Sequence, residues 1–260
     1  AEIRLKIIEL LYKAGASHLG SNMSVIEILI SMYSLVDIEK IKQNKNDRSR
    51  IIVSKGHCAV ATYTILNFYG LLSEEQLNTY HLDDSLLAGH VSHSVPYVEH
   101  STGALGHGLS VALGCALGQK SKNYKESLSL CLCGDGEIQE GSIWEALMFA
   151  GHKKLDNLVV FIDYNKISSI TNTNDIVNLE SLTDKFDSFN FNTTTVDGHN
   201  VEEIMSKVKS MVFKKKPVAV ICDTIKGKDI PFAENEAIWH YRSLNEELYL
   251  EAKEHLKKII

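Results

Sequence analysis

The sequence lacks the features that mark a secreted, membrane-bound or nucleic-acid-binding protein. It has 5 cysteines in 260 residues, and none has the Cys-x-x-Cys spacing of zinc and redox motifs. No apolar run approaches the roughly 18 residues that span a bilayer, and charged residues interrupt the first turns, where a signal peptide would be apolar. The net charge of −6 provides no basic surface for nucleic acid. We therefore expect a cytoplasmic protein with reduced cysteines that binds neither membranes nor nucleic acid.

Proline is scarce as well, with 3 in the whole chain, so few helices or strands are interrupted. Hydrophobic residues make up 44% of the sequence, which is enough for a large core. No linker, internal repeat or low-complexity tract divides the chain. We expect residues 1–260 to form a single α/β domain.

One stretch combines a strand, a tight turn and a helix. The apolar run 128–133 stops abruptly at Gly134, Asp135 and Gly136, and a helical pattern follows. A second apolar run, 158–162, comes after that helix. This order predicts a βαβ unit whose two parallel strands end side by side.

The side chains at the two strand ends indicate a metal ion. Asp135 follows the first strand and Asn165 the second, so both are expected at the edge of the sheet where ligands bind. The turn glycines let the backbone approach a ligand, and a helix start favours an anion such as a diphosphate. A carboxylate would repel that diphosphate unless a divalent cation lay between them. Oxygen ligands favour Mg²⁺ or Ca²⁺ over zinc.

A dinucleotide-binding loop of the Rossmann type is the alternative for this turn. Its glycine pattern requires Gly or Ala at position 139, where this chain has Gln139. We prefer the metal–diphosphate interpretation, because the flanking strands, the helix and Asn165 all have the spacing that it needs.

The wider pattern resembles transketolase. The glycine–aspartate–glycine turn with Asn165 is similar to the thiamin diphosphate motif, and the likeness runs from about Ser17 to His240. The segments that carry it most clearly are residues 134–146, 150–152, 158–163 and 165–167. The length fits only the amino-terminal half of a transketolase. The chain thus resembles the N-terminal subunit of a split transketolase, which implies a three-layer α/β/α fold with a mainly parallel sheet, the diphosphate-binding domain of thiamin diphosphate enzymes.

The resemblance also implies which residues hold the cofactors, thiamin diphosphate and Mg²⁺ or Ca²⁺. The metal ligands would be Asp135, Asn165 and the backbone carbonyl of Ile167. The coenzyme contacts would be His57, Gly103, Leu105, Gly134, Asp135, Gly136 and Asn165. Among these, His57 would bind the diphosphate, and the backbone around Gly103 would touch the aminopyrimidine.

Four residues are implied as catalytic: His18, His90, His240 and Glu140. Taken alone, His18 also fits a loop histidine bonded to backbone, His240 an aromatic surface patch, and Glu140 a charge favoured at a helix start. In the family the three histidines contact sugar hydroxyls and shuttle protons, which suits imidazole near neutral pH. The glutamate reaches towards a coenzyme bound across a subunit interface.

Three residues depart from the family pattern. Val91 and Ala104 replace prolines, and His107 replaces a glutamine, so we expect looser turns at the first two positions. The usual Asp-Gly after Ile167 is also missing, and we expect a mobile polar loop over residues 168–174. Three further histidines, at positions 81, 93 and 100, are expected in loops or on the surface, because their spacing suits no metal cluster.

The other elements follow from periodicity and turn residues. We expect helices at about 2–14, 24–35, 139–151, 178–190, 200–213 and 245–258, and strands at 50–53, 191–196 and 217–223. The helix at 139–151 is apolar or small around most of its circumference, which predicts that it is buried on all sides. In the family this helix lies at the subunit interface.

The resemblance implies transfer of a two-carbon ketol unit from a ketose or ketose phosphate to an aldose. The glutamate that activates the coenzyme, and the basic groups that bind the sugar phosphate, belong to the other half of a transketolase. We therefore expect this chain to be inactive alone and to need a C-terminal partner subunit, in an α2β2 heterotetramer. Two alternatives stay open: the α subunit of a thiamin-dependent 2-oxo-acid dehydrogenase or decarboxylase, and a non-catalytic assembly subunit.

Overall fold

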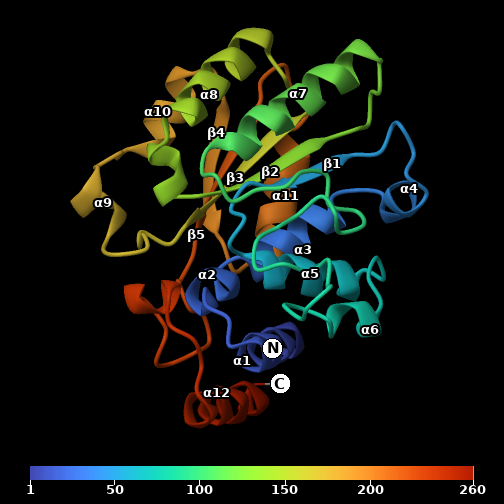
Figure 1. Cartoon of the computed structure of the whole chain (residues 1–260). Coiled ribbons are helices and arrows are strands. Elements are labelled where there is room, and N and C mark those ends of the chain that lie inside the picture. The colour runs from blue at the N-terminus through green and yellow to red at the C-terminus, as the bar shows by residue number, and fades with distance from the viewer. Residues whose placement is uncertain (260) are drawn as a thin grey trace.

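The computed structural model describes residues 1–259, and its centre is a parallel sheet of five strands (Figure 1). The strands are β1 (Arg50–Val53), β2 (Ser129–Gly134), β3 (Leu158–Tyr164), β4 (Asn192–Asp197) and β5 (Val218–Asp223). Their order in the sheet is β1-β2-β3-β5-β4, and every neighbouring pair is parallel. The predicted α/β fold with a parallel sheet is confirmed.

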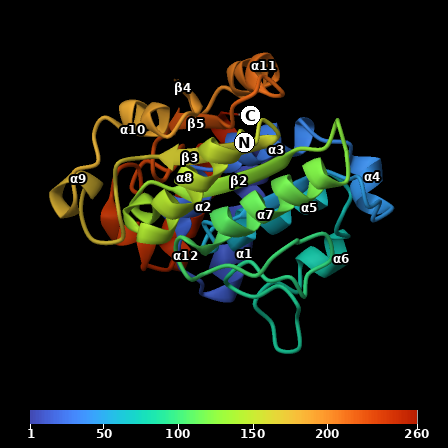
Figure 2. The same cartoon turned by 90° about the horizontal axis from the view of Figure 1, so that it is seen from above.

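Alternate residues of each strand face two separate cores, as expected for a parallel sheet covered on both sides. In β2, Leu130 and Leu132 join one core, whereas Cys131 and Cys133 join the other. The first core is covered by α3 (Ile26–Ser34), α5 (Ala59–Phe68) and α11 (Val201–Met211), and the second by α7 (His107–Ser121), α8 (Gly141–Lys153) and α10 (Leu182–Ser188). Figures 1 and 2 show these helices as two layers on opposite faces of the sheet.

Two further helices extend the first layer away from the sheet. Helix α1 (Glu2–Ala14) packs on α5, and α12 (Glu246–Lys258) packs on α1 (Figure 1). Their contact includes Tyr12 and Tyr249, whose rings stack with centroids 4.4 Å apart. The short helices are α2 (Leu19–Met23), α4 (Ile38–Lys42), α6 (Glu74–Leu77), α9 (Thr173–Ile176) and the 3-10 helices Gly136–Gln139 and Ala237–His240.

The helix predicted from residue 139 is divided in the structure. Residues Gly136–Gln139 form a 3-10 helix, Glu140 is extended with ψ of 133°, and α8 begins at Gly141. Glu140 therefore occupies the N-cap position of α8. The break separates the turn that carries Asp135 from α8 and places Glu140 between them.

Two other boundaries differ from the sequence prediction. The helix expected at 178–190 is limited to α10, because the side chain of Ser181 caps it by accepting a hydrogen bond from the N–H of Asp184. The segment expected to be a loop includes the start of α9, and Ile167 forms an isolated antiparallel bridge with Asn172. The polar composition of residues 168–181 predicts neither the start of α10 at Leu182 nor the bridge between Ile167 and Asn172.

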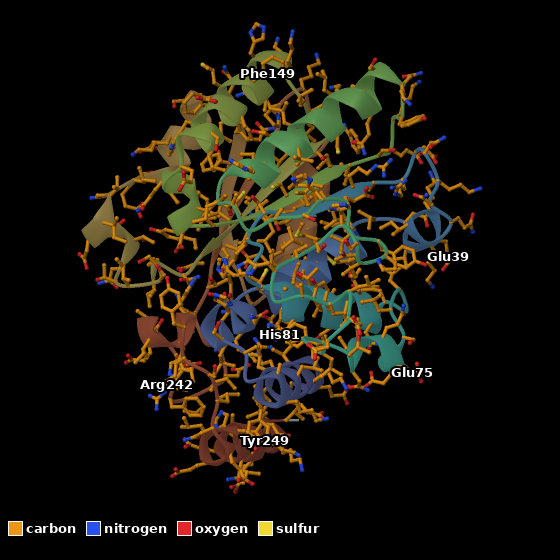
Figure 3. The ribbon with its side chains drawn as sticks, viewed as in Figure 1. Glu39, Glu75, His81, Phe149, Arg242 and Tyr249 are labelled. Carbon is orange, nitrogen blue, oxygen red and sulfur yellow. The ribbon has the colours of Figure 1, made fainter. Side chains whose placement is uncertain are left out.

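Packing within this chain buries only one side of the helix expected at 139–151, so burial in the chain's own core does not account for its apolar surface. Ile143, Leu147 and Ala150 pack in the second core, but Met148 is 60% exposed and Phe149 is 41% exposed. Figure 3 shows Phe149 at the outer end of α8, at the top of the view. The helix thus has an apolar face that no other part of this chain, over residues 1–259, covers.

Among residues 1–259, every helix is too short or too polar to cross a bilayer. All five cysteines are free thiols, and four of them are buried. Cys131 and Cys133 lie on one face of β2 with their sulfur atoms 3.7 Å apart. These cysteines fill the core as small hydrophobic side chains.

Candidate active site

A cavity of about 590 Å³ opens at the carboxyl ends of the strands. It is lined by segments that follow β1, β2, β3 and β5, together with the loops around residues 18, 90 and 103. Every residue predicted for the site lies on its wall: His18, His57, His90, Gly103, Leu105, Gly134, Asp135, Gly136, Glu140, Asn165, Ile167 and His240. The fold therefore brings together positions that are more than two hundred residues apart.

Four histidine rings form a cluster on one side of this cavity. The ring centroid of His18 lies 5.4 Å from that of His57, 5.6 Å from that of His90 and 5.0 Å from that of His240. The rings of His57 and His240 are 4.9 Å apart. Several imidazole nitrogens thus reach one small volume, in which a polyhydroxylated ligand would find many hydrogen-bonding partners.

Backbone contacts hold this cluster in place. The buried side chain of Asn22 donates from Nδ2 to the carbonyl of His18 at 2.8 Å and to that of His57 at 3.4 Å. The hydroxyl of Tyr63 donates to the carbonyl of His90 at 3.0 Å. These bonds use the main chain of the histidines and leave their rings to face the cavity.

Three of these histidines, His18, His57 and His240, have lowered pKa values. Burial, together with the nearby His90 and Lys55, lowers the pKa of His18 to about 4. Burial and the charge of Lys226 lower the pKa of His240 to about 3, and burial holds the pKa of His57 well below its usual range. The three rings are therefore neutral near pH 7, so each has one nitrogen that donates and one that accepts.

Another part of the cavity wall carries the buried carboxylate of Asp135. Its Oδ1 accepts a hydrogen bond from the N–H of Gly136 at 2.7 Å, and its Oδ2 accepts one from the N–H of Lys166. Burial, reinforced by the nearby carboxylate of Asp163, raises the pKa of Asp135 to about 7, although Lys55 and the backbone donors oppose the shift. A divalent cation beside this carboxylate would remove that electrostatic cost.

Two further oxygen atoms lie on the same wall. The amide of Asn165 donates from Nδ2 to Asp163 at 3.0 Å, and its Oδ1 accepts from the N–H of Ile167 at 3.1 Å. The carbonyl of Ile167 accepts from Nζ of Lys226 at 3.1 Å. Carboxylate, amide and carbonyl oxygens are the donors that Mg²⁺ and Ca²⁺ prefer, so this set fits a hard divalent cation. Within residues 1–259, no group of three or more His, Cys, Asp or Glu side chains offers a different metal site.

Packing within this chain does not require glycine at positions 134 and 136. A Cβ atom built on Gly134 would meet nothing closer than 3.7 Å, and one on Gly136 nothing closer than 3.8 Å. Neither glycine has a positive φ. A ligand that approaches the backbone closely would explain both glycines, since a side chain there would occupy its space.

Two buried lysines were missed by the sequence reasoning. Lys55 forms an ion pair with Asp163 in which both side chains are almost fully buried, and its Nζ also donates to the carbonyl of Ser21 at 3.1 Å. Burial and the charge of Lys55 lower the pKa of Lys226 to about 8. The rule that found Asp135 also applies to them, because Lys55 follows β1 and Lys226 follows β5.

The residues that depart from the family pattern have different surroundings. The N–H of the buried Val91 donates to the carbonyl of Gly56 at 3.0 Å, a bond that a proline could not make. The looser turn expected at Val91 is therefore compensated by this bond. Ala104 is exposed, and so is His107, the first residue of α7. His81 and His93 are exposed as expected.

Known proteins are similar to this chain in sequence and fold. Residues 1–257 match the family described as "Transketolase, thiamine diphosphate binding domain". The chain is 38% identical to one of the subunits of the apulose-4-phosphate transketolase of Phocaeicola vulgatus, over 96% of this chain and 89% of that protein. It is 36% identical to the 6-deoxy-6-sulfo-D-fructose transketolase subunit SqwG of a Clostridium species, over 98% of this chain and 94% of that protein.

Other transketolases are longer, and this chain matches only part of their length. The transketolase of Homo sapiens is 32% identical over 93% of this chain, which is 39% of that protein. The crystal structure of transketolase from Campylobacter jejuni superposes with a TM-score of 0.80 at 28% identity, over 99% of this chain and 43% of that one. The resemblance inferred from the sequence is thus confirmed, and the chain belongs to the transketolase family.

Proposed function

We propose that this chain is the N-terminal subunit of a two-chain transketolase. It would move a two-carbon ketol unit from a ketose or ketose phosphate to an aldose, with thiamin diphosphate and Mg²⁺ as cofactors. The observation that carries the proposal is the meeting of four histidine rings and an oxygen-rich wall in one cavity. The 260 residues would act as a single coenzyme-binding domain of that enzyme.

The oxygen-rich wall is assigned to cofactor binding. Asp135, Asn165 and the carbonyl of Ile167 would hold the metal ion. His57 and Lys226 would bind the diphosphate, since a buried cation and an imidazole N–H both favour an anion. Lys226 would exchange its bonds to backbone carbonyls for the diphosphate. When bound, the coenzyme supplies the carbanion chemistry that cleaves and forms carbon–carbon bonds.

The histidine cluster is assigned to substrate binding and proton transfer. The rings of His18, His90 and His240 would form hydrogen bonds with sugar hydroxyls, and the neutral rings of His18 and His240 would each donate one such bond and accept another. The same rings would take a proton from a donor hydroxyl and return one to the acceptor aldehyde oxygen. Their spacing of 5.0 and 5.6 Å from His18 lets two rings contact neighbouring hydroxyls of one sugar.

The exposed apolar residues of α7 and α8 support the proposal that a partner chain binds there. Leu117, Met148 and Phe149 are between 39% and 60% exposed. A Cβ atom on Gly114 or Gly118 would meet nothing within 4 Å, so another chain could approach the helix backbone there. The partner would supply the rest of the site, and two copies of each chain would form an α2β2 heterotetramer. Glu140, which lines the cavity as the N-cap of α8, would reach towards coenzyme bound across that interface.

The named relatives and the cysteines bear on the substrate class and the location. The two relatives that are subunits of divided enzymes are named for different sugars, so we propose a role in carbohydrate metabolism without choosing a sugar. Free cysteines support a reducing compartment, which makes the cytoplasm our proposed location.

An assay with and without the partner chain tests this function. The chain with its partner, Mg²⁺ and thiamin diphosphate should transfer a ketol unit from a ketose phosphate, and neither chain should do so by itself. A 2-oxo acid offered as the donor provides the control for the related dehydrogenase or decarboxylase reaction. Turnover by the isolated chain, or preference for the 2-oxo acid, would contradict the proposal.

A further inference from the structure

A buried glutamate outside the predicted set links three parts of the site. Glu137 is 2% exposed and lies in the 3-10 helix that follows Asp135. Its Oε1 accepts hydrogen bonds from the N–H of Gly106 at 2.9 Å and from the hydroxyl of Ser54. Its Oε2 accepts one from the N–H of Gly134 at 3.0 Å. One carboxylate therefore connects the ends of β1 and β2 to the start of α7.

Ser54 extends this connection into the helix. Its Oγ accepts a hydrogen bond from the N–H of Gly108 at 3.1 Å. Gly106 is the N-cap of α7 and Gly108 its second residue, so their N–H groups lack partners within the helix. Glu137 and Ser54 satisfy these groups from two other elements. A Cβ atom on Gly108 would lie 2.5 Å from Cβ of Ser54, which shows how closely the parts are packed.

The loop before α7 is held mainly at its two ends. At one end the N–H of Thr102 donates to the carbonyl of Val91 at 2.9 Å. At the other end Gly106 donates to Glu137, and its carbonyl accepts from the hydroxyl of Ser142 at 3.1 Å. Over the described residues 1–259, the backbone N–H groups of residues 103–105 form no hydrogen bond. Gly103 and Leu105, within this stretch, line the cavity.

The glycine turn is anchored more firmly than this loop. Gly134 lies at the end of β2 and is in register with Asp163 of β3. The N–H of Asp135 also donates to the carbonyl of Asp163 at 3.2 Å. Loss of Glu137 would therefore release the loop at 103–105 more than it would move the turn.

We propose that Glu137 is a positioning residue that fixes the loop at 103–105 relative to the Gly134 turn. This rests on the proposed function and on the family resemblance, which implies that the loop meets the aminopyrimidine end of the coenzyme and that the glycine turn lies at its diphosphate end. The carboxylate is required because its two acceptor oxygens serve three donors, whereas a glutamine side chain offers one acceptor and would place an NH₂ group against an N–H. The protein then contacts the coenzyme at both ends only while Glu137 keeps the loop at its distance from the Gly134 turn.

The test compares two ligands that differ in whether they reach the loop. Thiamin diphosphate spans both ends of the site, whereas inorganic pyrophosphate occupies only the diphosphate end. Both would be titrated calorimetrically, with Mg²⁺, into the assembled enzyme carrying wild-type chain, Glu137→Ala, Glu137→Gln or Ser54→Ala. Glu39→Gln is the matched control, because Glu39 lies on the surface of α4, away from the cavity (Figure 3).

We expect Glu137→Ala to lose about 10- to 100-fold in affinity for thiamin diphosphate, the range typical of removing a group that orients a direct contact. Its affinity for pyrophosphate should stay within about twofold, and Glu137→Gln and Ser54→Ala should lie between it and the wild type. Equal losses for both ligands, or no loss for either, would overturn the inference. If Glu137→Ala fails to fold, Glu137→Gln is used in its place, and its loss of affinity for thiamin diphosphate is compared with its loss of affinity for pyrophosphate. A wild-type enzyme that binds pyrophosphate but not thiamin diphosphate would instead refute the proposed function.

Discussion

The amide nitrogen of Asn165 donates to Oδ2 of Asp163 at 3.0 Å, and this bond fixes which way the amide oxygen points. Asp163 is itself fully buried and bound by Lys55, Thr224 and the hydroxyl of Ser24, the last at 2.7 Å. Burial alone would raise the pKa of Asp163, but Lys55 and these hydroxyls lower it. A carboxylate with a lowered pKa, near the carboxyl end of β3, thus orients a proposed metal ligand.

Replacing Asp163 by Asn tests this arrangement. The change leaves Lys55 buried without its counter-charge, a loss that typically costs about 3–5 kcal/mol of stability. It also replaces one of the two acceptor oxygens of residue 163 by an NH₂ group, which weakens the hydrogen bonding that orients Asn165, so the affinity for Mg²⁺ should fall about 10- to 100-fold. Chemical denaturation and a Mg²⁺ titration measure the two effects. Unchanged Mg²⁺ affinity in a folded variant would contradict the orienting role.

The histidine cluster predicts a separation of catalysis from coenzyme binding. His18→Asn should lower kcat/KM for the donor sugar by about 100-fold or more, the usual size of a general acid–base contribution. Its affinity for thiamin diphosphate should be nearly unchanged. Asn suits this position because His18 has a φ of 70°, which Asn tolerates. His255→Asn, on α12, is the matched control and should behave as wild type. Equal loss in both variants would argue against the assigned role.

The same cluster predicts how stability depends on pH. The folded-state pKa values of His18 and His240, about 4 and about 3, lie below the unfolded value of about 6.5. Below that value the unfolded chain takes up protons that the folded chain does not, so the free energy of unfolding should fall as the pH drops from about 6.5 to about 4.

Urea denaturation of the chain over this pH range measures the effect. The raised pKa of Asp135 acts in the opposite direction between its unfolded value and about 7, but it is common to wild type and His18→Asn. The variant should therefore lose less stability on acidification than the wild type. A steeper loss in the variant would contradict the low pKa assigned to His18.

The glycines of α7 that have no neighbouring atoms predict a variant with a more stable fold and weaker binding to the partner chain. Gly118→Leu adds a side chain where nothing lies within 4 Å, and it removes a glycine from a helix interior, so the chain should gain up to about 1 kcal/mol of stability. The same side chain should prevent the partner chain from packing on this face. Thermal unfolding and sedimentation of the two-chain mixture check both effects. Normal assembly by Gly118→Leu would place the partner elsewhere.

The sequence was most informative where a rule is local. Asp135 and Asn165 were predicted at one edge of the sheet because parallel strands joined by a helix end together, and the strand pairing of β2 with β3 bears this out. The histidines were found through the family resemblance, since nothing in the pattern around His90 places it near His18. Their clustering depends on how loops pack together, and the sequence of a loop has no periodic pattern that predicts its packing.

The residues that were missed make their contacts over long separations. Lys55 pairs with an aspartate 108 positions away, and Glu137 accepts from Ser54 across 83 positions. Such partners cannot be read from spacing. The exposed side of α8 was missed for another reason, because an apolar helix surface looks the same whether its own chain or another covers it.

In the proposed site, a divalent cation joins Asp135 to the diphosphate of the coenzyme. The most direct test is a calorimetric titration of thiamin diphosphate into the assembled enzyme, with and without Mg²⁺, for the wild type and Asp135→Asn, with the exposed Asp187→Asn as control. We predict tight binding only with Mg²⁺, and a loss of at least about 100-fold in Asp135→Asn alone, because a direct ligand should matter more than the groups behind it. Equally tight binding without Mg²⁺, or by Asp135→Asn, would contradict the account.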